Sequence, residues 1–214
     1  MNALKSRNDW DIINKSLENN QITVVDNFFT QATLFTLKNR MLYESKFHDY
    51  YGEKKYQAIN YLPETDSITD LIVKNLKQKI KILPEFKRGW SFIYANNSNG
   101  VRLHSDPSLI NLNVWVSDDD ISTDPKLNGL IIYEIFPPSG WERKDWNGNH
   151  EKVLKYLEDK KIEPVKVNYK NNRAVFFNGM YLHKSDKIAV KKQLNKRRIS
   201  YTLLFGLNEN RNFR

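Results

Sequence analysis

From Gly89 onward the chain is a series of short runs rich in β-branched and aromatic residues, each separated from the next by turn-forming residues. The runs are WSFIYA, GVRLHSD, LINLNVWV, GLIIYEIF, EPVKVNY, RAVFFNG and RRISYTLLFG. Short strands at this spacing predict a β-sandwich or a β-barrel. The one interruption, His150 to Lys160, has the pattern of a surface helix between two strands.

The first 88 residues have a mainly helical pattern instead. Apolar residues at helical spacing, together with capping signals, predict three helices there: Asp9–Leu17, Thr30–Tyr43 and Ser67–Ile82. The run ITVVDNFF between the first two is β-rich. We therefore expect an α+β chain that is mainly β. A helical N-terminal part, residues 1–88, should pack on a β core formed by residues 89–207.

Length and composition limit the class of protein. The 214 residues fit one domain spanning 1–214, and 40% hydrophobic with 13% aromatic residues is a globular composition. No apolar run approaches the roughly 18–20 residues of a membrane span, and the start, MNALKSRNDWDII, lacks the apolar core of a secretory signal. The absence of cysteine excludes disulfides, a thiolate nucleophile and a zinc–thiolate site. We expect a cytoplasmic protein without membrane contact.

The net charge is 34 − 25 = +9, which would suit an anionic partner such as nucleic acid. Lysine, asparagine and isoleucine are abundant along the whole chain, however, and an AT-rich genome produces this bias without any binding partner. We therefore favour a small-molecule or peptide substrate. A nucleic-acid-directed demethylase or binding module is the alternative that the charge keeps open.

The stretch VRLHSDPS places His104 and Asp106 two residues apart near the end of a predicted strand. Strand side chains alternate between faces, so positions 102, 104 and 106 should point the same way. A third ligand would come from elsewhere. His183, which ends the β-rich RAVFFNGMYLH, is favoured over His48 and His150, which lie in polar, surface-type segments. Two histidines and one carboxylate form the facial triad of non-haem Fe(II) oxygenases. The alternative is a loop mouth with two polar residues and no metal.

The segment RRISYTLLFG could bind an anionic cosubstrate. On a strand, Arg198, Ser200 and Thr202 share one face. The distal carboxylate of 2-oxoglutarate requires a cation, and a guanidinium can bind it through two hydrogen bonds. Arg198 would do so, with a further hydrogen bond from Ser200. Otherwise Arg198 is an exposed residue of the basic run KKQLNKRR.

The order HSD, NLNVWVSDDDISTDPKLNGLIIYE, RAVFFNGMYLH and RRISYTLLFG resembles that of bacterial Fe(II)/2-oxoglutarate-dependent dioxygenases of the hydroxylase-like group. The segment VVDNFFTQATLFTLKNRML is similar to the strand–helix entry of these enzymes. The resemblance extends from about Val24 to Gly206 and is densest after Gly100. It implies a double-stranded β-helix, which is a jelly-roll or cupin-like barrel, with the N-terminal helices packed on it.

The resemblance also implies three groups of site residues. The catalytic metal ligands would be His104, Asp106 and His183. The cosubstrate contacts would be Arg198, Ser200, Asn113 and Tyr94. The substrate contacts would be Trp115, as a wall of the site, and Arg102. The implied cofactors are Fe(II), 2-oxoglutarate as cosubstrate, and O₂, and the implied reaction hydroxylates an unactivated C–H bond with release of succinate and CO₂.

Two departures from the family pattern matter for these assignments. The interval between His183 and Arg198 is long and contains KSDKIAVKKQLNK, so Arg197 is a rival for the carboxylate-binding role. Asn128-Gly129 stands where Gly-Gly is usual, which suits a tight turn. The presence of Asp106 argues against a halogenase, which needs that position vacated. A metal-binding jelly roll without oxygenase activity is the alternative from another functional class.

Overall fold

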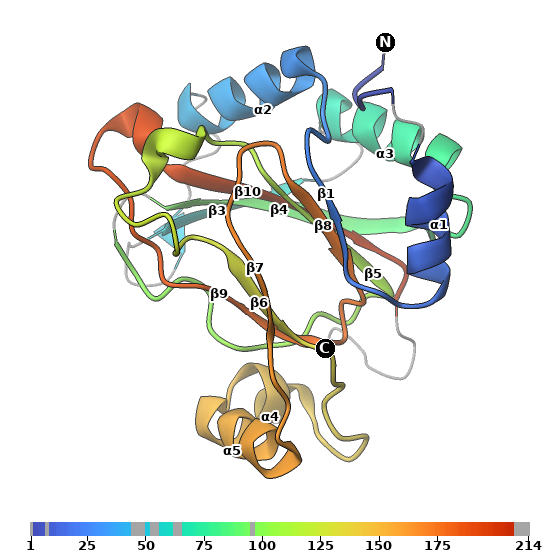
Figure 1. Cartoon of the computed structure of the whole chain (residues 1–214), viewed down its shortest axis with the longest axis vertical. Coiled ribbons are helices and arrows are strands. Elements are labelled where there is room, and N and C mark those ends of the chain that lie inside the picture. Colours follow the sequence, from blue (N-terminus) through green and yellow to red (C-terminus); the bar gives the residue numbers. More distant parts are fainter. Residues whose placement is uncertain are drawn as a thin grey trace.

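The computed structural model describes residues 2–6, 9–43, 50–51, 56–61, 66–94 and 97–207. Within them, a seven-stranded and a three-stranded antiparallel sheet face each other (Figure 1). The large sheet has the order β1 (Thr23–Val25), β8 (Ala174–Phe177), β5 (Ile110–Trp115), β10 (Arg198–Phe205), β4 (Phe86–Tyr94), β3 (Tyr56–Tyr61) and β2 (Tyr50–Tyr51). The small sheet has the order β7 (Val165–Val167), β6 (Leu130–Tyr133) and β9 (Leu182–Ser185).

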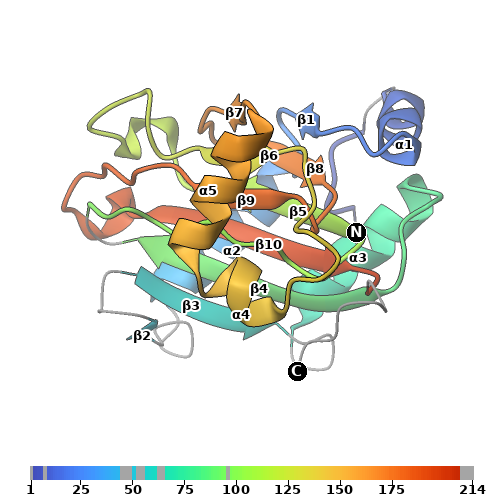
Figure 2. The same ribbon diagram turned by 90° about the horizontal axis from the view of Figure 1, so that it is seen from below.

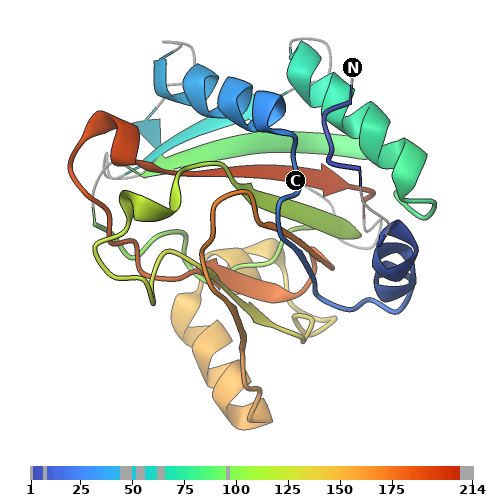
Figure 3. The same cartoon turned by 45° about the horizontal axis from the view of Figure 1, so that its top comes forward.

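Two helices cover the outer side of the large sheet, α2 (Gln31–Tyr43) and α3 (Ser67–Lys79), and α1 (Trp10–Glu18) lies at one end of the sheet (Figure 1). Figure 3 shows α2 and α3 lying along this sheet. The main hydrophobic core fills the space between them, and its members include Leu37 and Met41 of α2, Ile72 and Leu76 of α3, and Ile199, Tyr201, Leu203 and Phe205 of β10. Because strand side chains alternate, β10 turns Arg198, Ser200 and Thr202 toward the small sheet.

Two further helices, α4 (Arg143–Asn147) and α5 (His150–Lys160), lie outside the small sheet (Figure 2). Val153 and Leu157 of α5 form a hydrophobic cluster with Leu103 and Leu182. Leu103 and Leu182 directly precede His104 and His183, the two histidines that were expected to bind metal. The helix predicted at His150–Lys160 is therefore present, and it supports the backbone from which the two histidines project.

The α+β arrangement expected from the sequence is confirmed, with differences in three places. The run GVRLHSD forms an isolated bridge between His104 and His183 where a strand was predicted. The residues after RAVFF turn at Asn178–Tyr181 and start a separate strand, β9, in the other sheet. The first 88 residues also contribute strands to the large sheet, where β1 pairs with β8 and β3 pairs with β4. Each difference arises from pairing between distant segments.

The helices agree more closely with their predicted ranges. Thr30 precedes α2 and accepts a hydrogen bond from the backbone N–H of Thr33 through its hydroxyl, as an N-cap does. The third helix begins at Ser67 as expected, but it ends at Lys79 rather than Ile82. Among the described residues, no helix has the length and apolar character needed to span a bilayer. His48, which was expected at the surface, lies outside the described residues.

Candidate metal and cosubstrate site

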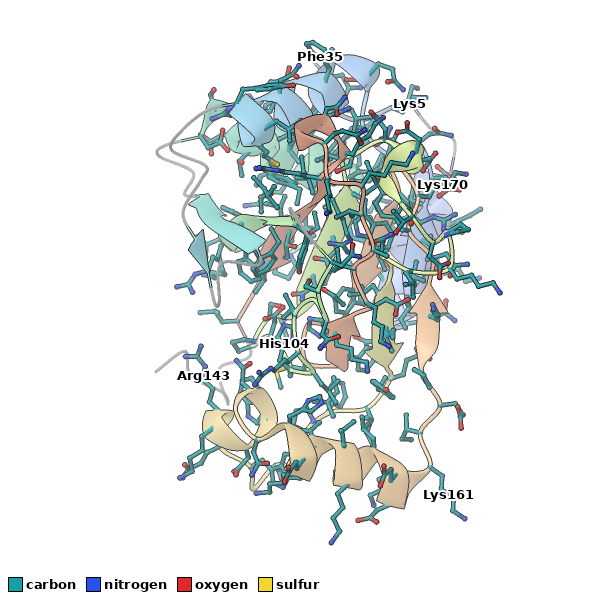
Figure 4. All side chains as sticks on the ribbon, turned by 90° about the vertical axis from the view of Figure 1, so that its left-hand side faces the viewer. Lys5, Phe35, His104, Arg143, Lys161 and Lys170 are labelled. Carbon is teal, nitrogen blue, oxygen red and sulfur yellow. The ribbon has the colours of Figure 1, made fainter. Side chains whose placement is uncertain are left out.

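His104 and His183 face each other across the isolated bridge. The backbone N–H of His104 donates to the carbonyl oxygen of His183 at 3.0 Å, and the reciprocal bond is 2.8 Å long. This pairing brings the two imidazole ring centroids to 4.3 Å from each other. In Figure 4, His104 lies on the side of the barrel next to α4 and α5. The bridge therefore places two candidate metal-binding side chains together although they are 79 positions apart in the sequence (183 − 104).

Hydrogen bonds fix the orientation of both rings. Nδ1 of His104 lies 2.8 Å from the carbonyl oxygen of Arg102, and Nδ1 of His183 lies 2.8 Å from that of Tyr181. A carbonyl oxygen only accepts, so each Nδ1 carries the proton and each Nε2 of the neutral ring presents a lone pair. The Nε2 atoms face Asp106, at 3.7 Å from Oδ1 for His104 and 3.4 Å from Oδ2 for His183.

These three residues form a group that could hold a metal ion, with one ligand atom from each within 4.8 Å of the others. Burial, together with the close approach of the second imidazole of His183, lowers the pKa of His104 to about 4. Burial alone would raise the pKa of Asp106, but its contacts with His183, His104 and Asn111 outweigh this effect and lower it. A neutral imidazole and an ionised carboxylate are the forms that bind metal. Near neutral pH both groups are therefore ready to act as ligands.

A second polar centre surrounds Arg198 at the start of β10. Its side chain is 2% exposed, and its guanidinium carbon lies 5.0 Å from the ring centroid of Tyr94 and 5.8 Å from that of Trp115. Nε donates to the carbonyl oxygen of Asn128 at 2.7 Å. Nη1 is buried and has no hydrogen-bond partner among the described residues. Leaving a charged donor unpaired in the interior costs free energy, so this atom is suited to an anionic ligand.

Arg197, the rival residue, has a different environment. Its side chain is partly exposed, and its carbonyl oxygen accepts a hydrogen bond from Ser117 Oγ at 2.8 Å. The geometry therefore turns Arg198 rather than Arg197 into the interior between the sheets. Ser200, which is 8% exposed, is two residues further along the same face of β10.

Asn128 holds the turn that supports Arg198. Its φ of 71° lies in the left-handed region, which asparagine tolerates better than most residues. Its side chain accepts from the backbone N–H of Ala189 at 2.8 Å, and it donates to the Ala189 carbonyl at 3.0 Å and to Ser122 Oγ at 2.7 Å. No residue with a Cβ fits in place of Gly129, because the Cβ would lie 2.3 Å from the carbonyl oxygen of Val167. The sequence indicated a tight turn, and the structure shows that this turn positions a guanidinium.

The remaining predicted residues fall into two groups. Tyr94, Asn113 and Trp115 lie near Arg198 or on the same inner face of the sheet: Tyr94 pairs with Arg198 in register, Trp115 with Ser200 and Asn113 with Thr202. The Asn113 Oδ1 atom is buried without a hydrogen-bond partner among the described residues. Arg102 differs, because its side chain is exposed and only its carbonyl oxygen takes part, as the acceptor for His104.

Sequence reasoning missed a buried polar group behind Asp106. Asn111 Nδ2 donates to Asp106 Oδ2 at 2.7 Å, and Asn111 Oδ1 accepts a hydrogen bond from Ser108 Oγ. The available signal was the spacing in NLN, which puts Asn111 on the same face of β5 as Asn113. Its partner could not be read from the sequence, since the segment of Asp106 is not a regular strand.

No family model matches the chain, and no curated protein matches it. Solved structures do. The non-haem α-ketoglutarate-dependent epimerase SnoN of nogalamycin biosynthesis is 9% identical, with a TM-score of 0.64 over 92% of this chain and 82% of the other. HygX from Streptomyces hygroscopicus, with nickel and 2-oxoglutarate bound, is 12% identical, with a TM-score of 0.61 over 98% of this chain and 90% of the other.

A prolyl-4-hydroxylase from Pseudomonas putida is 12% identical, with a TM-score of 0.57 over 92% of this chain and 99% of the other. At such identities the likeness establishes the fold. The predicted double-stranded β-helix is therefore confirmed, and the chain has the fold on which Fe(II)/2-oxoglutarate-dependent enzymes are built.

Proposed function

We propose that the protein is an Fe(II)- and 2-oxoglutarate-dependent dioxygenase that hydroxylates an unactivated C–H bond of a small molecule or a peptide. One observation carries the proposal: the same interior contains a two-histidine, one-carboxylate cluster and a buried guanidinium with an unpaired donor. The cluster alone would suit many metal proteins. A buried arginine without an anion is costly, and 2-oxoglutarate offers both a chelating end for the metal and a carboxylate for Arg198.

The donor set fits iron. Two neutral imidazoles and one carboxylate are the ligands of the facial triad, which leaves open coordination positions. When bound, iron would supply the oxygen chemistry, in which substrate, 2-oxoglutarate and O₂ give hydroxylated substrate, succinate and CO₂, with one oxygen atom of O₂ in the hydroxyl group and the other in succinate. The chain's own contribution is to hold the ligands: the carbonyl oxygens of Arg102 and Tyr181 keep the Nε2 lone pairs of both histidines toward the centre.

The surroundings of Arg198 fit the distal carboxylate of 2-oxoglutarate. Nη1 would donate to one carboxylate oxygen, and Ser200 Oγ on the same strand face would add a hydrogen bond. Tyr94 and Asn113 are the further cosubstrate contacts that we propose. The 2-oxoglutarate bound to HygX supports this assignment by analogy of fold.

Apolar side chains around these groups would keep water away from the reaction. Trp115, Val175 and Phe177 belong to a buried cluster between the sheets, and the ring centroid of Phe177 lies 4.9 Å from that of His183. Such surroundings strengthen electrostatic contacts and protect a reactive site from solvent. We propose Trp115 as a wall of the site and Arg102, which is exposed, as a substrate contact at the surface.

The outcome of the oxidation and the identity of the substrate are the finer parts of this proposal. Solved structures of similar fold include the epimerase SnoN, the carbocyclase SnoK and a prolyl hydroxylase in complex with a hypoxia-inducible-factor peptide. We propose hydroxylation, and the retained Asp106 supports it against halogenation, which needs that position vacated. The cytoplasm stays our predicted location.

An anaerobic titration with Fe(II) and 2-oxoglutarate tests the proposal. We expect the weak visible charge-transfer band of the iron–oxoglutarate chelate in the wild type, and its loss in His183→Ala. Arg198→Ala should need a much higher 2-oxoglutarate concentration, whereas the matched control Arg197→Ala should behave like the wild type, since Arg197 is partly exposed and Arg198 is buried. Succinate release under O₂ would complete the assignment.

Three other results would redirect it. Metal binding without any band favours the metal-binding jelly roll that lacks oxygenase activity. Binding of neither component removes the metal site altogether. A band that Arg197→Ala weakens more than Arg198→Ala would move the carboxylate-binding role to Arg197.

A further inference from the structure

Four residues from two segments form a buried polar network behind the metal cluster. The backbone N–H of Asp106 donates to the carbonyl oxygen of Gly179 at 2.8 Å, and Asn111 Nδ2 donates to Asp106 Oδ2 at 2.7 Å. Ser108 Oγ donates to Asn111 Oδ1. Ser108 and Asn111 are both 0% exposed. Hydrogen bonds between buried groups hold the members of such a network in one arrangement.

The orientation of the Asn111 amide is fixed by its neighbours. The hydroxyl of Ser108 donates to Oδ1, so the opposite end of the amide, which carries the two N–H bonds, has to face Asp106. Gly179 provides the necessary space, because a Cβ at this position would lie 2.0 Å from Ser108 Oγ and 2.6 Å from Asn111 Oδ1. The turn between β8 and β9 therefore encloses the amide and leaves it no room to rotate away.

The two carboxylate oxygens of Asp106 are consequently different. Oδ2 accepts the Asn111 N–H and lies 3.4 Å from Nε2 of His183, whereas Oδ1 accepts no hydrogen bond within the described residues and lies 3.7 Å from Nε2 of His104. A carboxylate with one oxygen committed to an amide can offer the other as a single ligand atom. If both oxygens bound the metal, the carboxylate would occupy one more position that the cosubstrate and O₂ need.

We propose that Asn111 is a positioning residue for the metal ligand Asp106: by holding Oδ2 it fixes the orientation of the carboxylate and leaves Oδ1 as the oxygen that is free of hydrogen bonds for the metal. The inference rests on the proposed function, because it assigns a role within the same metal site. Asn111 acts through Asp106 and contacts neither substrate nor cosubstrate in this role. Partners behind a metal ligand commonly change metal affinity by about 10–100-fold when they are removed.

The test uses Co(II) alone as the probe, with affinity and visible absorption as readouts. Asn111→Leu removes the donor at similar volume, and we expect Co(II) binding to weaken by about 10–100-fold, with a changed absorption spectrum as the carboxylate pivots. Asn14→Leu is the matched control, because Asn14 is also a buried amide, which donates to the carbonyls of Trp10 and Lys79 at 2.8 and 2.9 Å. It should lower the melting temperature and leave Co(II) affinity unchanged.

Two results would overturn the proposal by showing a purely structural role for Asn111. In the first, Asn111→Leu binds Co(II) as tightly as the wild type. In the second, Asn111→Leu and the control Asn14→Leu lose the same amount of Co(II) affinity. If Asn111→Leu does not fold, Ser108→Ala decides in its place, with a smaller loss in the same direction expected and an unchanged affinity overturning the idea. Wild-type protein that binds Co(II) through Asp106 but forms no complex with 2-oxoglutarate would refute the proposed function and leave this inference standing. Wild-type protein that binds no Co(II) would refute both.

Discussion

At the scale of single residues, the candidate site depends on groups that orient other groups. Nδ1 of each histidine donates a hydrogen bond to a backbone carbonyl oxygen. The guanidinium of Arg198 donates to the carbonyl oxygen of Asn128, and the carboxylate of Asp106 accepts a hydrogen bond from Asn111. Each of these hydrogen bonds sets the direction of a side chain and also contributes to stability, by about 0.5–1.5 kcal/mol for a neutral pair and about 1.5–3 kcal/mol where one partner is charged.

The variant Asn128→Gly tests the contribution of the Asn128 side chain separately from that of its backbone conformation. Glycine adopts a φ of 71° without strain, so the variant keeps the turn and loses only the side-chain bonds to Ala189 and Ser122. We expect a loss of about 1–3 kcal/mol in the free energy of unfolding, since the backbone groups of buried Ala189 lose their partner. We also expect weaker 2-oxoglutarate binding, because the carbonyl that holds Arg198 becomes less fixed.

Urea unfolding and isothermal titration with 2-oxoglutarate in the presence of Mn(II) would measure the two effects. Asn128→Ala should destabilise the chain further than Asn128→Gly, because alanine at a positive φ adds about 1–2 kcal/mol of backbone strain. Equal stability of Asn128→Gly and wild type would contradict the role of these side-chain bonds.

At the scale of elements, an ion-pair group joins β1 at one edge of the large sheet to the segment that precedes β8. Asp26 lies next to β1, and its carboxylate accepts from Arg173 Nε at 2.6 Å and from Lys170 Nζ at 2.8 Å. The hydrogen bond from Arg173, reinforced by Lys170, lowers the pKa of Asp26 from 3.8 to about 2. Since β1 has only three residues, this contact helps to fix a short edge strand.

The pKa of Asp26 predicts how the stability of the edge depends on pH. The folded-state pKa is below the unfolded value, so the contribution is fully present above about pH 5 and is lost progressively toward about pH 1 as the pH falls through 3.8 and then about 2. Asp26→Asn should therefore cost stability near pH 6, and the difference from the wild type should shrink to a small fraction of that cost by pH 2. The side chain is 32% exposed, so solvent screening limits the effect to about 1 kcal/mol or less.

Unfolding in urea at several pH values would reveal this dependence. Glu158→Gln, an acid-to-amide change on the exposed side of α5, serves as the control for the chemical change itself. A difference between Asp26→Asn and wild type that stayed constant down to pH 2 would contradict the ion-pair account.

At the scale of the whole molecule, the features that local spacing determines could be predicted. His104 and Asp106, two residues apart, both reach the cluster even though their segment is not a regular strand. The alternation of side chains on β10 predicted that Arg198 and Ile199 face opposite ways, and Arg198 is buried between the sheets while Ile199 belongs to the main core. The net charge still allows a nucleic-acid partner, and the preference for a small-molecule or peptide substrate stays a prediction.

The features that depend on pairing between distant segments could not be predicted. The separation of β9 from β8 follows from the pairing of Leu182–Ser185 with β6, which no local pattern encodes. The contact between Asn111 and Asp106 depends in the same way on the turn at Gly179. Sequence periodicity reports which side of an element a residue occupies, but it does not report which other element lies opposite.

Because His183 belongs to the small sheet, Arg198 to the large sheet, and His104 and Asp106 to a segment outside both, filling the site should stabilise the chain as a whole. A ligand at 100 times its Kd adds about 2.7 kcal/mol to the free energy of unfolding if it binds only the folded chain. For a chain of this size that corresponds to a rise in melting temperature of about 5–11 °C. We expect such a rise with Mn(II), a further rise when 2-oxoglutarate is added, and reversal of the metal effect by EDTA.

The order of addition makes the experiment specific. If the metal forms part of the 2-oxoglutarate site, the cosubstrate should raise the melting temperature far less without metal than with it, and Asp106→Ala should abolish the metal-dependent part. Arg198→Ala should keep the response to metal and lose most of the response to 2-oxoglutarate, since the two groups bind different ends of the cosubstrate. The opposite result would be that metal and 2-oxoglutarate raise the melting temperature by independent, additive amounts in both Asp106→Ala and the wild type. Metal and 2-oxoglutarate would then bind at separate places, and the interior between the two sheets would not be a single site.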